Sequence, residues 1–296
     1  MTLPALIYDN GHSPKGGARS MGDILVANGR LSPQDAIRVL NRQKINKRPF
    51  GEAGVELKVL TQEDIDFALS KQFNYPYLTG ADTSLSGDLV AAYQPFSKVG
   101  ENLRAVRSQL MLRWFDNDPA HKVLAVVSPG SAEGRTFIAA NLAIVFAQQG
   151  ERTLLIDGDL RSPTGCGQRA LFKLTNGLGL SSILAGRAGL DIAQPVPGLP
   201  GLVVLPAGAR PPNPQELLGR ISFSKLLFEA SENFDVILVD TPSGTQYADA
   251  EIIASRAGAA MMVTRKNQSR IPDAALLARR LVNDDVALVG AVLNDA

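Results

Sequence analysis

The stretch VLAVVSPGSAEGRTFIAANLA at residues 123–143 decides the fold of this chain. Its apolar run, 123–127, is followed by a turn of small residues and then by a helical pattern. A turn of this kind between a strand and a helix offers backbone N–H groups to phosphate. A second apolar run ends in LLIDGDLRSP at 154–163, where two aspartates stand one residue apart. The pattern predicts a protein that handles a nucleoside triphosphate.

Apolar runs alternate with helical patterns from this stretch to residue 293. The runs expected as strands are 123–127, 153–157, 202–206, 235–240, 259–264 and 286–293. Continuous apolar strands separated by helices predict an α/β fold, with a mainly parallel sheet covered by helices on both faces. Ligands of such sheets bind beyond the carboxyl ends of the strands, where the turn and the acidic residues lie.

The turn before the helix carries the expected nucleotide contacts. They are Gly130, Ser131, Ala132, Glu133, Gly134, Arg135, Thr136 and Phe137. The Thr136 hydroxyl stands where Mg²⁺ needs a ligand. The stretch departs from the pattern GxxxxGK[ST], because Arg135 replaces the lysine and Pro129 the first glycine. Arginine keeps the positive charge but spreads it over a planar fork, so phosphate binding is expected while the transfer rate is left open.

Three aspartates follow at the ends of apolar runs. Asp240 ends the run VILV, where a carboxylate can hold Mg²⁺ through water. Asp157 and Asp159 can orient a nucleophile or complete the metal shell. An aspartate at a strand end is usually a cap or a solvated turn residue. Nucleotide binding is favoured because all the motifs occur in order at strand ends of one predicted sheet.

An internal repeat precedes this domain. Gly22 pairs with Gly51, Leu31 with Leu60 and Asp35 with Asp64, at a constant offset of 29 residues. Each copy predicts a short helix, a turn, an approximate capping box and a second helix. The expected organisation is a flexible N-terminus at 1–18, a helical two-repeat domain at 19–80, a linker at 81–95 and the nucleotide-binding domain at 96–296.

Composition limits the partners and the compartment. The net charge is +1, with 30 basic and 29 acidic residues, so no overall field favours nucleic acid. A single cysteine excludes an intrachain disulfide and fits a reducing compartment. No apolar stretch approaches the roughly 18 to 20 residues of a membrane span, and no secretory signal is evident. We therefore expect a cytoplasmic protein with no nucleic-acid partner.

Residues from about 95 to 296 resemble the bacterial tyrosine kinases of polysaccharide export, relatives of the MinD and ParA ATPases. The resemblance rests on SPGSAEGRTFIAANLA at 128–143 as Walker A, LLIDGDLRSP at 154–163 as Walker A′, LVVLPAGARPPNPQELL at 202–218 and DVILVDTP at 235–242 as Walker B. It implies a protein-tyrosine autokinase, dependent on ATP and Mg²⁺, that regulates exopolysaccharide or capsule polymerisation, export and chain length. EGR[ST] in place of EGK[ST] is similar to the EpsG subgroup.

The resemblance also implies roles for single residues. Arg135 takes the place of the Walker A lysine and Thr136 that of the Mg²⁺ ligand. Asp157 and Asp159 take the places of the catalytic aspartates, with Asp157 activating the tyrosine hydroxyl and also binding the metal. Asp240 takes the place of the Walker B carboxylate. The segment from Pro129 to Glu133 lacks the signature lysine of MinD and ParA proteins, which favours a kinase. A MinD/ParA-like ATPase and a nucleotide-gated scaffold with little phosphotransfer remain alternatives.

Partners are implied in the same way. Glu101, Arg104 and Arg107 in ENLRAVR match the family motif ExxRxxR and are expected on one helix face, as a subunit contact or as a solvated face. A separate membrane adaptor is implied, which would hold the chain at the inner membrane. The C-terminal tyrosine cluster of the family is missing, so any autophosphorylation must use other sites. The five tyrosines are Tyr8, Tyr75, Tyr77, Tyr93 and Tyr247.

The repeat domain resembles the N-terminal module of type II secretion and pilus ATPases, some of which bind cyclic di-GMP. Copy one keeps Gly22, Leu25, Gly29 and Leu31, but Ser20 stands where the motif has arginine. In copy two, Arg48 lies one place too early and Lys58 replaces the second glycine. Because expected ligand contacts are lost, a protein–protein module is favoured over a cyclic di-GMP site, and both remain open.

Overall fold

The chain folds into two compact units, 1–79 and 80–296, which are described separately. The computed structural model describes residues 20–73, 75–80, 82–116, 118–163, 165–175 and 177–295. The stretch 1–18, expected as a flexible N-terminus, lies outside the described residues. No helix within the described ranges is long and apolar enough to span a membrane.

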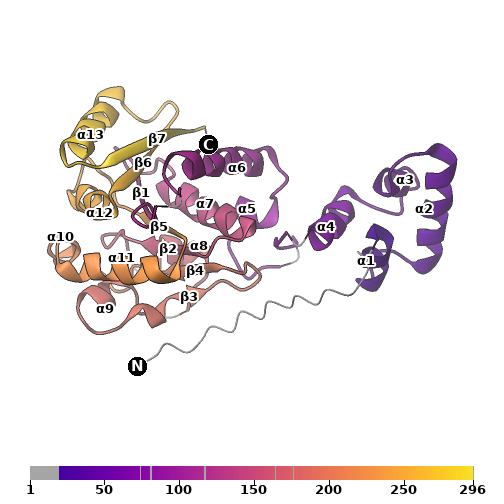
Figure 1. The fold of residues 1–296 in the computed structure, drawn as a ribbon, viewed down its shortest axis with the longest axis horizontal. Helices are drawn as coiled ribbons and strands as arrows, with labels where there is room; N and C mark the ends of the chain where they lie inside the picture. The colour runs from indigo at the N-terminus through magenta and orange to yellow at the C-terminus, as the bar shows by residue number, and fades with distance from the viewer. Residues whose placement is uncertain are drawn as a thin grey trace. The chain divides into compact units, whose positions relative to one another are not determined.

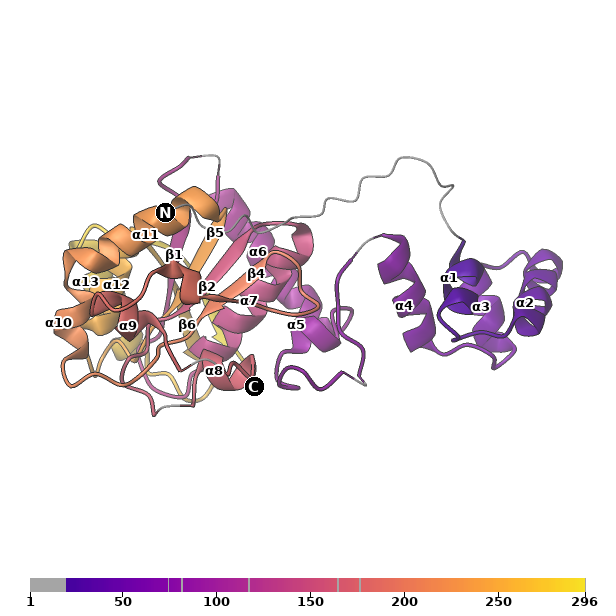
Figure 2. The ribbon, with the colours of Figure 1, turned by 90° about the horizontal axis from the view of Figure 1, so that it is seen from below.

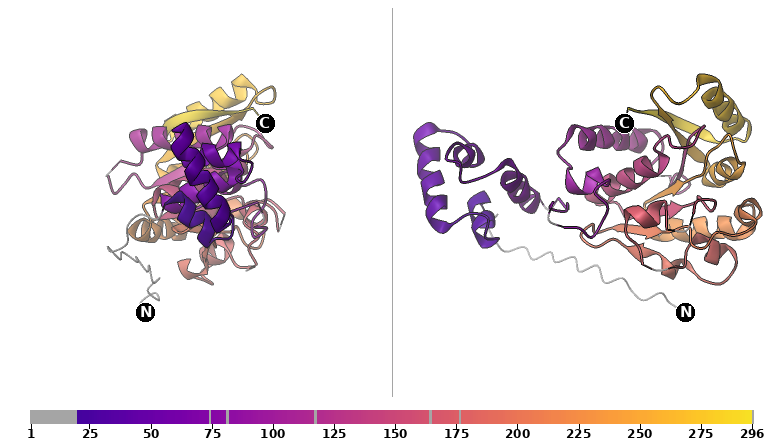
Figure 3. Two further views of the ribbon diagram at one scale, coloured as in Figure 1. Left: turned by 90° about the vertical axis from the view of Figure 1, so that its right-hand side faces the viewer. Right: turned by 180° about the vertical axis from the view of Figure 1, so that it is seen from behind.

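The described part of the first unit forms four helices, drawn in indigo and purple in Figures 1 and 3. They are α1 (Met21–Ala27), α2 (Pro33–Asn46), α3 (Phe50–Glu56) and α4 (Gln62–Gln72). Ser32 and Thr61 cap α2 and α4 through their hydroxyls, as the sequence predicts, and the Asp64 carboxylate accepts a hydrogen bond from Thr61 N. Ser20 and Asp23 form a further capping box on α1. The apolar faces meet in one small core that includes Leu25, Leu31 and Leu60.

The two copies of the repeat share a backbone turn. Gly29 ends the first turn with φ 69°, and Lys58, 29 residues later, has φ 57° at the equivalent place. A left-handed backbone suits glycine and is strained for lysine. Gly51 allows close packing, because a Cβ there would lie 3.0 Å from Ile65. The turn geometry of the repeat is therefore kept in copy two although its glycine is lost.

The second unit contains a seven-stranded sheet in the order β3-β4-β2-β5-β1-β6-β7. The strands are β1 (Val123–Val127), β2 (Thr153–Asp157), β3 (Gln194–Pro195), β4 (Leu202–Leu205), β5 (Val236–Asp240), β6 (Ala259–Arg265) and β7 (Ala287–Asn294). All neighbouring strands are parallel except the short pair β3–β4. Every residue of β1, β2 and β5 is buried, which explains their continuous apolar sequence. The predicted α/β fold is confirmed.

Helices cover both faces of this sheet (Figures 1 and 2). One face carries α5 (Val90–Tyr93), α6 (Lys98–Arg113) and α7 (Arg135–Gln149), with the short α8 (Gln168–Leu171) beside α7. The other carries α9 (Leu180–Leu184), α10 (Pro214–Leu218), α11 (Ile221–Asn233), α12 (Asp249–Ala257) and α13 (Ile271–Asn283). A 3₁₀ turn, Leu190–Ile192, precedes β3. Since β1, β2 and β5 are parallel neighbours, their carboxyl ends open at one edge.

The stretch expected as a linker, 81–95, differs from that expectation where it is described. It lies in the second unit, carries α5, and is fastened to α7 by the buried Asn141. The Asn141 side chain accepts a bond from Ala91 N (2.8 Å) and donates to Asp88 O (3.3 Å). These bonds form between distant parts of the chain, so a polar composition alone gave no sign of them.

Candidate nucleotide-binding and phosphotransfer site

The predicted phosphate-binding turn connects β1 to α7. Gly134 precedes α7 with φ 93°, a backbone conformation that favours glycine, and a Cβ there would lie 2.2 Å from Nδ2 of Asn294. Ala132 also has a positive φ, 58°. The turn delivers the chain into a helix of 15 residues, whose first N–H groups face the open end of the sheet. This arrangement can bind an anionic phosphate group.

Side chains from the β6 and β7 ends hold the carbonyl groups of the turn. Arg265 donates to Ala132 O (3.0 Å), Gln268 to Ser131 O (2.9 Å) and Asn294 to Glu133 O (3.1 Å). Because these side chains bond to its carbonyl oxygens, the turn is held in one conformation in the absence of a ligand. No local sequence pattern predicts this role for the three residues.

Glu133 differs from the other predicted nucleotide contacts, because its side chain is only 3% exposed. Its carboxylate accepts a hydrogen bond from Gly130 N (2.7 Å) and another from the Ser269 hydroxyl. The Gly130 amide, expected to bind phosphate, is thus occupied by a residue of the same turn. Glu133 shapes the turn, and the remaining amides are left for phosphate.

Arg135 lies at the first position of α7, and its guanidinium bonds to protein groups. Nε donates to Thr241 O (2.6 Å), and Nη1 donates to Gly130 O (2.9 Å) and to the Ser128 hydroxyl. These bonds join the phosphate-binding turn to the segment that follows β5. A lysine has one nitrogen and cannot make this set of planar contacts. Arg135 therefore has a structural task here besides carrying positive charge.

Two buried carboxylates meet at the ends of β2 and β5. Asp157 is 2% exposed, Asp240 is 0% exposed, and the two residues are partners in the parallel register. Burial, followed by the negative charge of Asp240, raises the pKa of Asp157 well above its ordinary value. Burial also raises the pKa of Asp240 to about 6, opposed by the charge of Arg135 and by hydrogen bonds from Thr136 and Gln168.

Gln168 connects this acidic pair to the start of α7. Its backbone N–H donates to Asp157 Oδ2 (3.0 Å), while its side-chain Nε2 donates to Asp240 Oδ2 (2.9 Å) and to Thr136 O (3.1 Å). Gln168 is fully buried. Its role was not predicted from the sequence, where its only signal is a polar residue after two glycines in the loop that follows Asp159.

The acidic pair fits a divalent cation. Among the described residues, Asp240 Oδ1 is buried without a hydrogen-bond partner, which is costly unless a proton or a cation neutralises it. The Thr136 side chain lies near the same carboxylate and helps to lower its pKa. The three predicted metal ligands, Thr136, Asp157 and Asp240, therefore come together. No cluster of three or more His, Cys, Asp or Glu suited to a metal occurs within the described ranges.

Asp159 uses both carboxylate oxygens to shape the loop after β2. Oδ1 accepts from Arg161 N (3.0 Å) and Ser162 N (3.1 Å), and Oδ2 accepts from the Ser162 hydroxyl (2.8 Å). This is the turn-capping use of an aspartate. The catalytic part expected of Asp159 stays a prediction.

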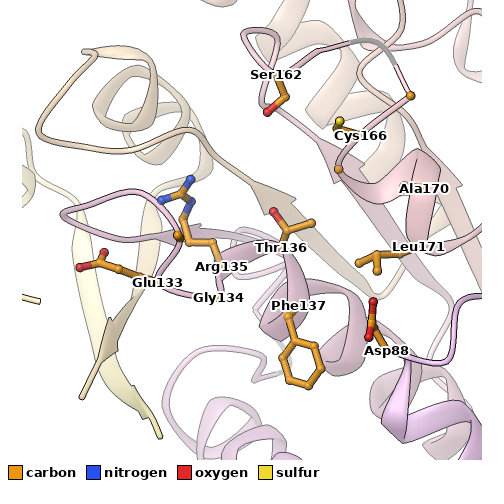
Figure 4. A pocket seen from close by; sticks show the side chains of 13 residues that line it. Asp88, Glu133, Gly134, Arg135, Thr136, Phe137, Ser162, Cys166, Ala170 and Leu171 are labelled. Carbon is orange, nitrogen blue, oxygen red and sulfur yellow. The ribbon is translucent and has the colours of Figure 1, made fainter. Parts of the chain in front are cut away.

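A cavity of about 510 Å³ opens beside Thr136 (Figure 4). The predicted stretch 132–137 forms one wall, although Gly130 and Ser131 do not line it. The other walls come from residues that the sequence analysis did not select: Asp88, Ser162, Gly165, Cys166, Gly167, Ala170 and Leu171. Figure 4 shows Thr136 on the side of Ser162 and Cys166, and Glu133 pointing away from them. A phosphate bound at the turn would thus face a space large enough for a second group.

Comparison with known proteins assigns the family. No family model matches the chain. It is 34% identical over 207 residues to the tyrosine-protein kinase YwqD of Bacillus subtilis, covering 70% of this chain and 85% of that protein. It is 33% identical over 204 residues to the putative tyrosine-protein kinase CapB of Staphylococcus aureus, covering 68% and 86%. The chain belongs to the bacterial tyrosine-protein kinases.

Solved structures agree with this family. The kinase domain of the Escherichia coli tyrosine kinase Etk matches with a TM-score of 0.67 at 30% identity, covering 76% of this chain and 86% of that one. MinD of Pyrococcus horikoshii, solved with Mg-ADP, matches with a TM-score of 0.51 at 23% identity, over 58% of this chain and 69% of that one. The MinD likeness shows the fold alone. The predicted relationship to tyrosine kinases on a MinD-like fold is confirmed.

The predicted contact motif of this kinase lies on α6. Within one chain, Arg104 is paired with Glu101, and Arg107 Nη1 donates to Val145 O on α7 (3.0 Å). The Glu101 side chain is exposed, whereas Arg104 also reaches back to Pro95 O. The motif therefore stabilises the folded chain, and its part in subunit contacts stays a prediction.

Proposed function

We propose that this chain is a protein-tyrosine kinase that transfers the γ-phosphate of ATP to a tyrosine hydroxyl. The observation that carries the proposal is the convergence of Asp157, Asp240 and Thr136 beside the phosphate-binding turn. Membership of the tyrosine-protein kinases supplies the acceptor class. The cavity beside Thr136 offers space for a phenol next to the phosphate.

Different residues of the site would bind the phosphates, accept the proton and hold the metal. The amides of the turn and the start of α7 would bind the phosphates of ATP, with Arg135 supplying positive charge. Asp157 would accept the phenol proton, because its carboxylate lies at the carboxyl end of β2 beside Asp240. The phenol oxygen bonds to the γ-phosphorus, the bond to the β,γ-bridging oxygen breaks, and ADP leaves. Thr136, Asp157 and Asp240 would hold Mg²⁺, which supplies charge neutralisation of the phosphates when bound.

An alternative function follows from Arg135. Because its guanidinium is bonded to Thr241 O and Gly130 O, less of it is available to a γ-phosphate. This favours a second candidate, a MinD/ParA-like ATPase or a nucleotide-gated scaffold with little phosphotransfer. The two candidates differ in whether phosphotyrosine forms.

The test uses purified full chain with ATP, Mg²⁺ and a synthetic tyrosine-containing polymer. The kinase predicts phosphotyrosine on the polymer or on the chain, and loss of that signal by at least about a hundredfold in Asp157→Asn. Released phosphate without phosphotyrosine would select the ATPase, and bound ATP without turnover the scaffold.

The biological role is proposed to be control of exopolysaccharide polymerisation, export and chain length. In support, the chain is 30% identical over 217 residues to a putative tyrosine-protein kinase in the cps region of Klebsiella pneumoniae. The resemblance further supports a membrane adaptor that recruits this kinase to the inner membrane and stimulates it, and a ring contact through Glu101, Arg104 and Arg107. Adding the cytoplasmic tails of candidate adaptors should raise phosphotyrosine formation by about tenfold or more; no tail doing so would contradict the recruitment scheme.

The first unit is proposed to act as a protein–protein module. Ser20, which stands where the cyclic di-GMP motif has arginine, is engaged in capping α1. Calorimetric titration of the full chain with cyclic di-GMP should give no heat up to high micromolar ligand, and measurable binding would select the second-messenger alternative.

A further inference from the structure

The tyrosines of this kinase differ in their exposure. Tyr8 lies outside the described residues. The hydroxyl of Tyr77 is buried, and that of Tyr93 bonds to both Leu85 N and Leu85 O at 3.2 Å. Tyr75 is half-buried. Tyr247 is 40% exposed and is the most accessible of the described tyrosines. Accessibility is the first requirement for a tyrosine that has to enter an active site.

Tyr247 stands at the edge of the phosphotransfer site. It lies seven positions after Asp240, in the segment between β5 and α12. Its backbone N–H donates to Ser243 O (3.3 Å), and the preceding residue, Gln246, accepts a bond from the Ser131 hydroxyl of the phosphate-binding turn (3.3 Å). The segment that presents Tyr247 is therefore fastened to the site while the ring remains exposed.

A fixed arginine lies against the Tyr247 ring. The guanidinium carbon of Arg161 is 3.9 Å from the ring centroid. Arg161 is held by the fully buried Asp249, through Nε (2.7 Å) and Nη2 (2.8 Å). Among the described residues, Arg161 Nη1 makes no hydrogen bond, so it is available to a new acceptor. A phosphate adds a charge of about −1.5 to −2 and three acceptor oxygens, which an adjacent arginine favours.

We propose that Tyr247 is a phosphorylation site which this kinase modifies on a second copy of itself. The inference rests on the proposed kinase function. Tyr247 does not line the cavity beside its own Thr136, so the phosphate comes from the nucleotide of another copy. The Tyr247 hydroxyl oxygen bonds to that γ-phosphorus, the β,γ-bridging bond breaks, ADP leaves, and the phenol proton passes to Asp157 of the donating copy.

The experiment mixes two full-length variants that carry tags of different mass. Asp157→Asn keeps Tyr247 but cannot transfer phosphate. Tyr247→Phe can transfer phosphate but lacks the acceptor, and its ring still stacks on Arg161. After incubation with ATP and Mg²⁺, mass spectrometry maps phosphotyrosine on each chain. A synthetic tyrosine-containing polymer reports kinase activity independently, and Tyr93→Phe is the matched control.

The expected result is phosphate on Tyr247 of the Asp157→Asn chain. Tyr247→Phe alone should lose about fivefold or more of its autophosphorylation relative to wild type, while Tyr93→Phe loses none and both phosphorylate the polymer within about twofold of wild type. Phosphotyrosine at other positions with Tyr247 unmodified, or no transfer between the mixed chains, overturns the inference and leaves the kinase standing. Absence of phosphate from the polymer as well as from every chain overturns the proposed function and the inference with it.

Discussion

Asp157 and Asp240 lie side by side at the carboxyl ends of β2 and β5, in direct register and almost fully buried. Two carboxylates in this position repel each other and have lost most of their water, so each favours its protonated form. Gln168 is the neutral donor that keeps the pair assembled, and a cation beside Thr136 would relieve the repulsion. The electrostatic free energy of the nucleotide-free site is therefore unfavourable, and binding of Mg²⁺ and phosphate can relieve it.

The first prediction concerns pH. The folded pKa of Asp240, about 6, lies above its ordinary value of 3.8. Protonated Asp240 therefore makes its full contribution to the free energy of unfolding below about pH 4. This contribution, at most about 3 kcal/mol, is lost as the pH rises through about 6. Asp240→Asn stays neutral, so its melting temperature should rise relative to wild type between pH 5 and about 7.5 in the absence of nucleotide.

The control for this experiment is Asp235, whose pKa shift is opposite in sign to that of Asp240. A hydrogen bond from Arg152 lowers the pKa of Asp235, so that group stabilises the chain above its ordinary pKa and loses this effect as the pH falls. Asp235→Asn should accordingly approach wild type toward low pH. A difference between Asp240→Asn and wild type that does not change with pH would contradict the account of the acidic pair.

Replacing Gln168 should separate transfer from binding. Gln168→Leu removes the side-chain hydrogen bonds to Asp240 Oδ2 and to Thr136 O, while the backbone bond to Asp157 remains. We expect kcat for phosphotyrosine formation to fall by about ten- to a hundredfold, with the Kd for ADP changed by less than about threefold. Gln148→Leu, which removes another buried glutamine far from the acidic pair, should leave kcat unchanged at a temperature where it is folded. Equal losses in the two variants would assign Gln168 a merely structural part.

Arg135→Lys tests the cross-link between the turn and the segment after β5. Lysine keeps the charge but loses most of the contacts to Thr241 O, Gly130 O and Ser128, which should cost about 1 to 3 kcal/mol in urea unfolding of the nucleotide-free chain. Nucleotide binding should survive in Arg135→Lys and weaken by about tenfold or more in Arg135→Ala. Arg113→Lys, which alters a single contact to Val289 O, serves as the control. Unchanged stability in Arg135→Lys would show that the guanidinium contacts are dispensable.

The Arg161–Asp249 pair should be strongly coupled. Arg161→Leu leaves the fully buried Asp249 without its partner, which should destabilise the chain by about 3 to 5 kcal/mol. Adding Asp249→Asn should restore much of that loss. The exposed pair Arg152–Asp235 provides a comparison, expected to contribute no more than about 1 kcal/mol. A double-mutant cycle in urea measures both, and additive effects at Arg161 and Asp249 would refute the coupling.

The strands and the acidic motifs could be predicted because their signals are local. Buried parallel strands have continuous apolar sequences, and residues at their carboxyl ends share one edge of the sheet, so the sequence alone places Asp157 and Asp240 at the same edge. The capped helices α2 and α4 were predictable for the same reason, since Ser32 and Thr61 stand next to the segments that they cap.

The missed features depend on contacts between distant segments. No local sequence pattern predicts that Gln168 contacts Asp240, that Asp88 lines the cavity, or that Arg135 bonds to Thr241. The two-residue strand β3 gave no pattern to detect. Helix α11 is not one of these features, because its signal is local: Phe223, Leu226, Leu227 and Ala230 follow helical spacing and are buried.

The central claim is tested most directly by the ratio of ADP to phosphotyrosine formed by the full chain with ATP, Mg²⁺ and a saturating tyrosine-containing polymer. A kinase predicts a ratio of about one to one, with inorganic phosphate close to the level of the Asp157→Asn variant. ADP and inorganic phosphate rising together while phosphotyrosine stays at the variant's level would contradict it and identify an ATPase.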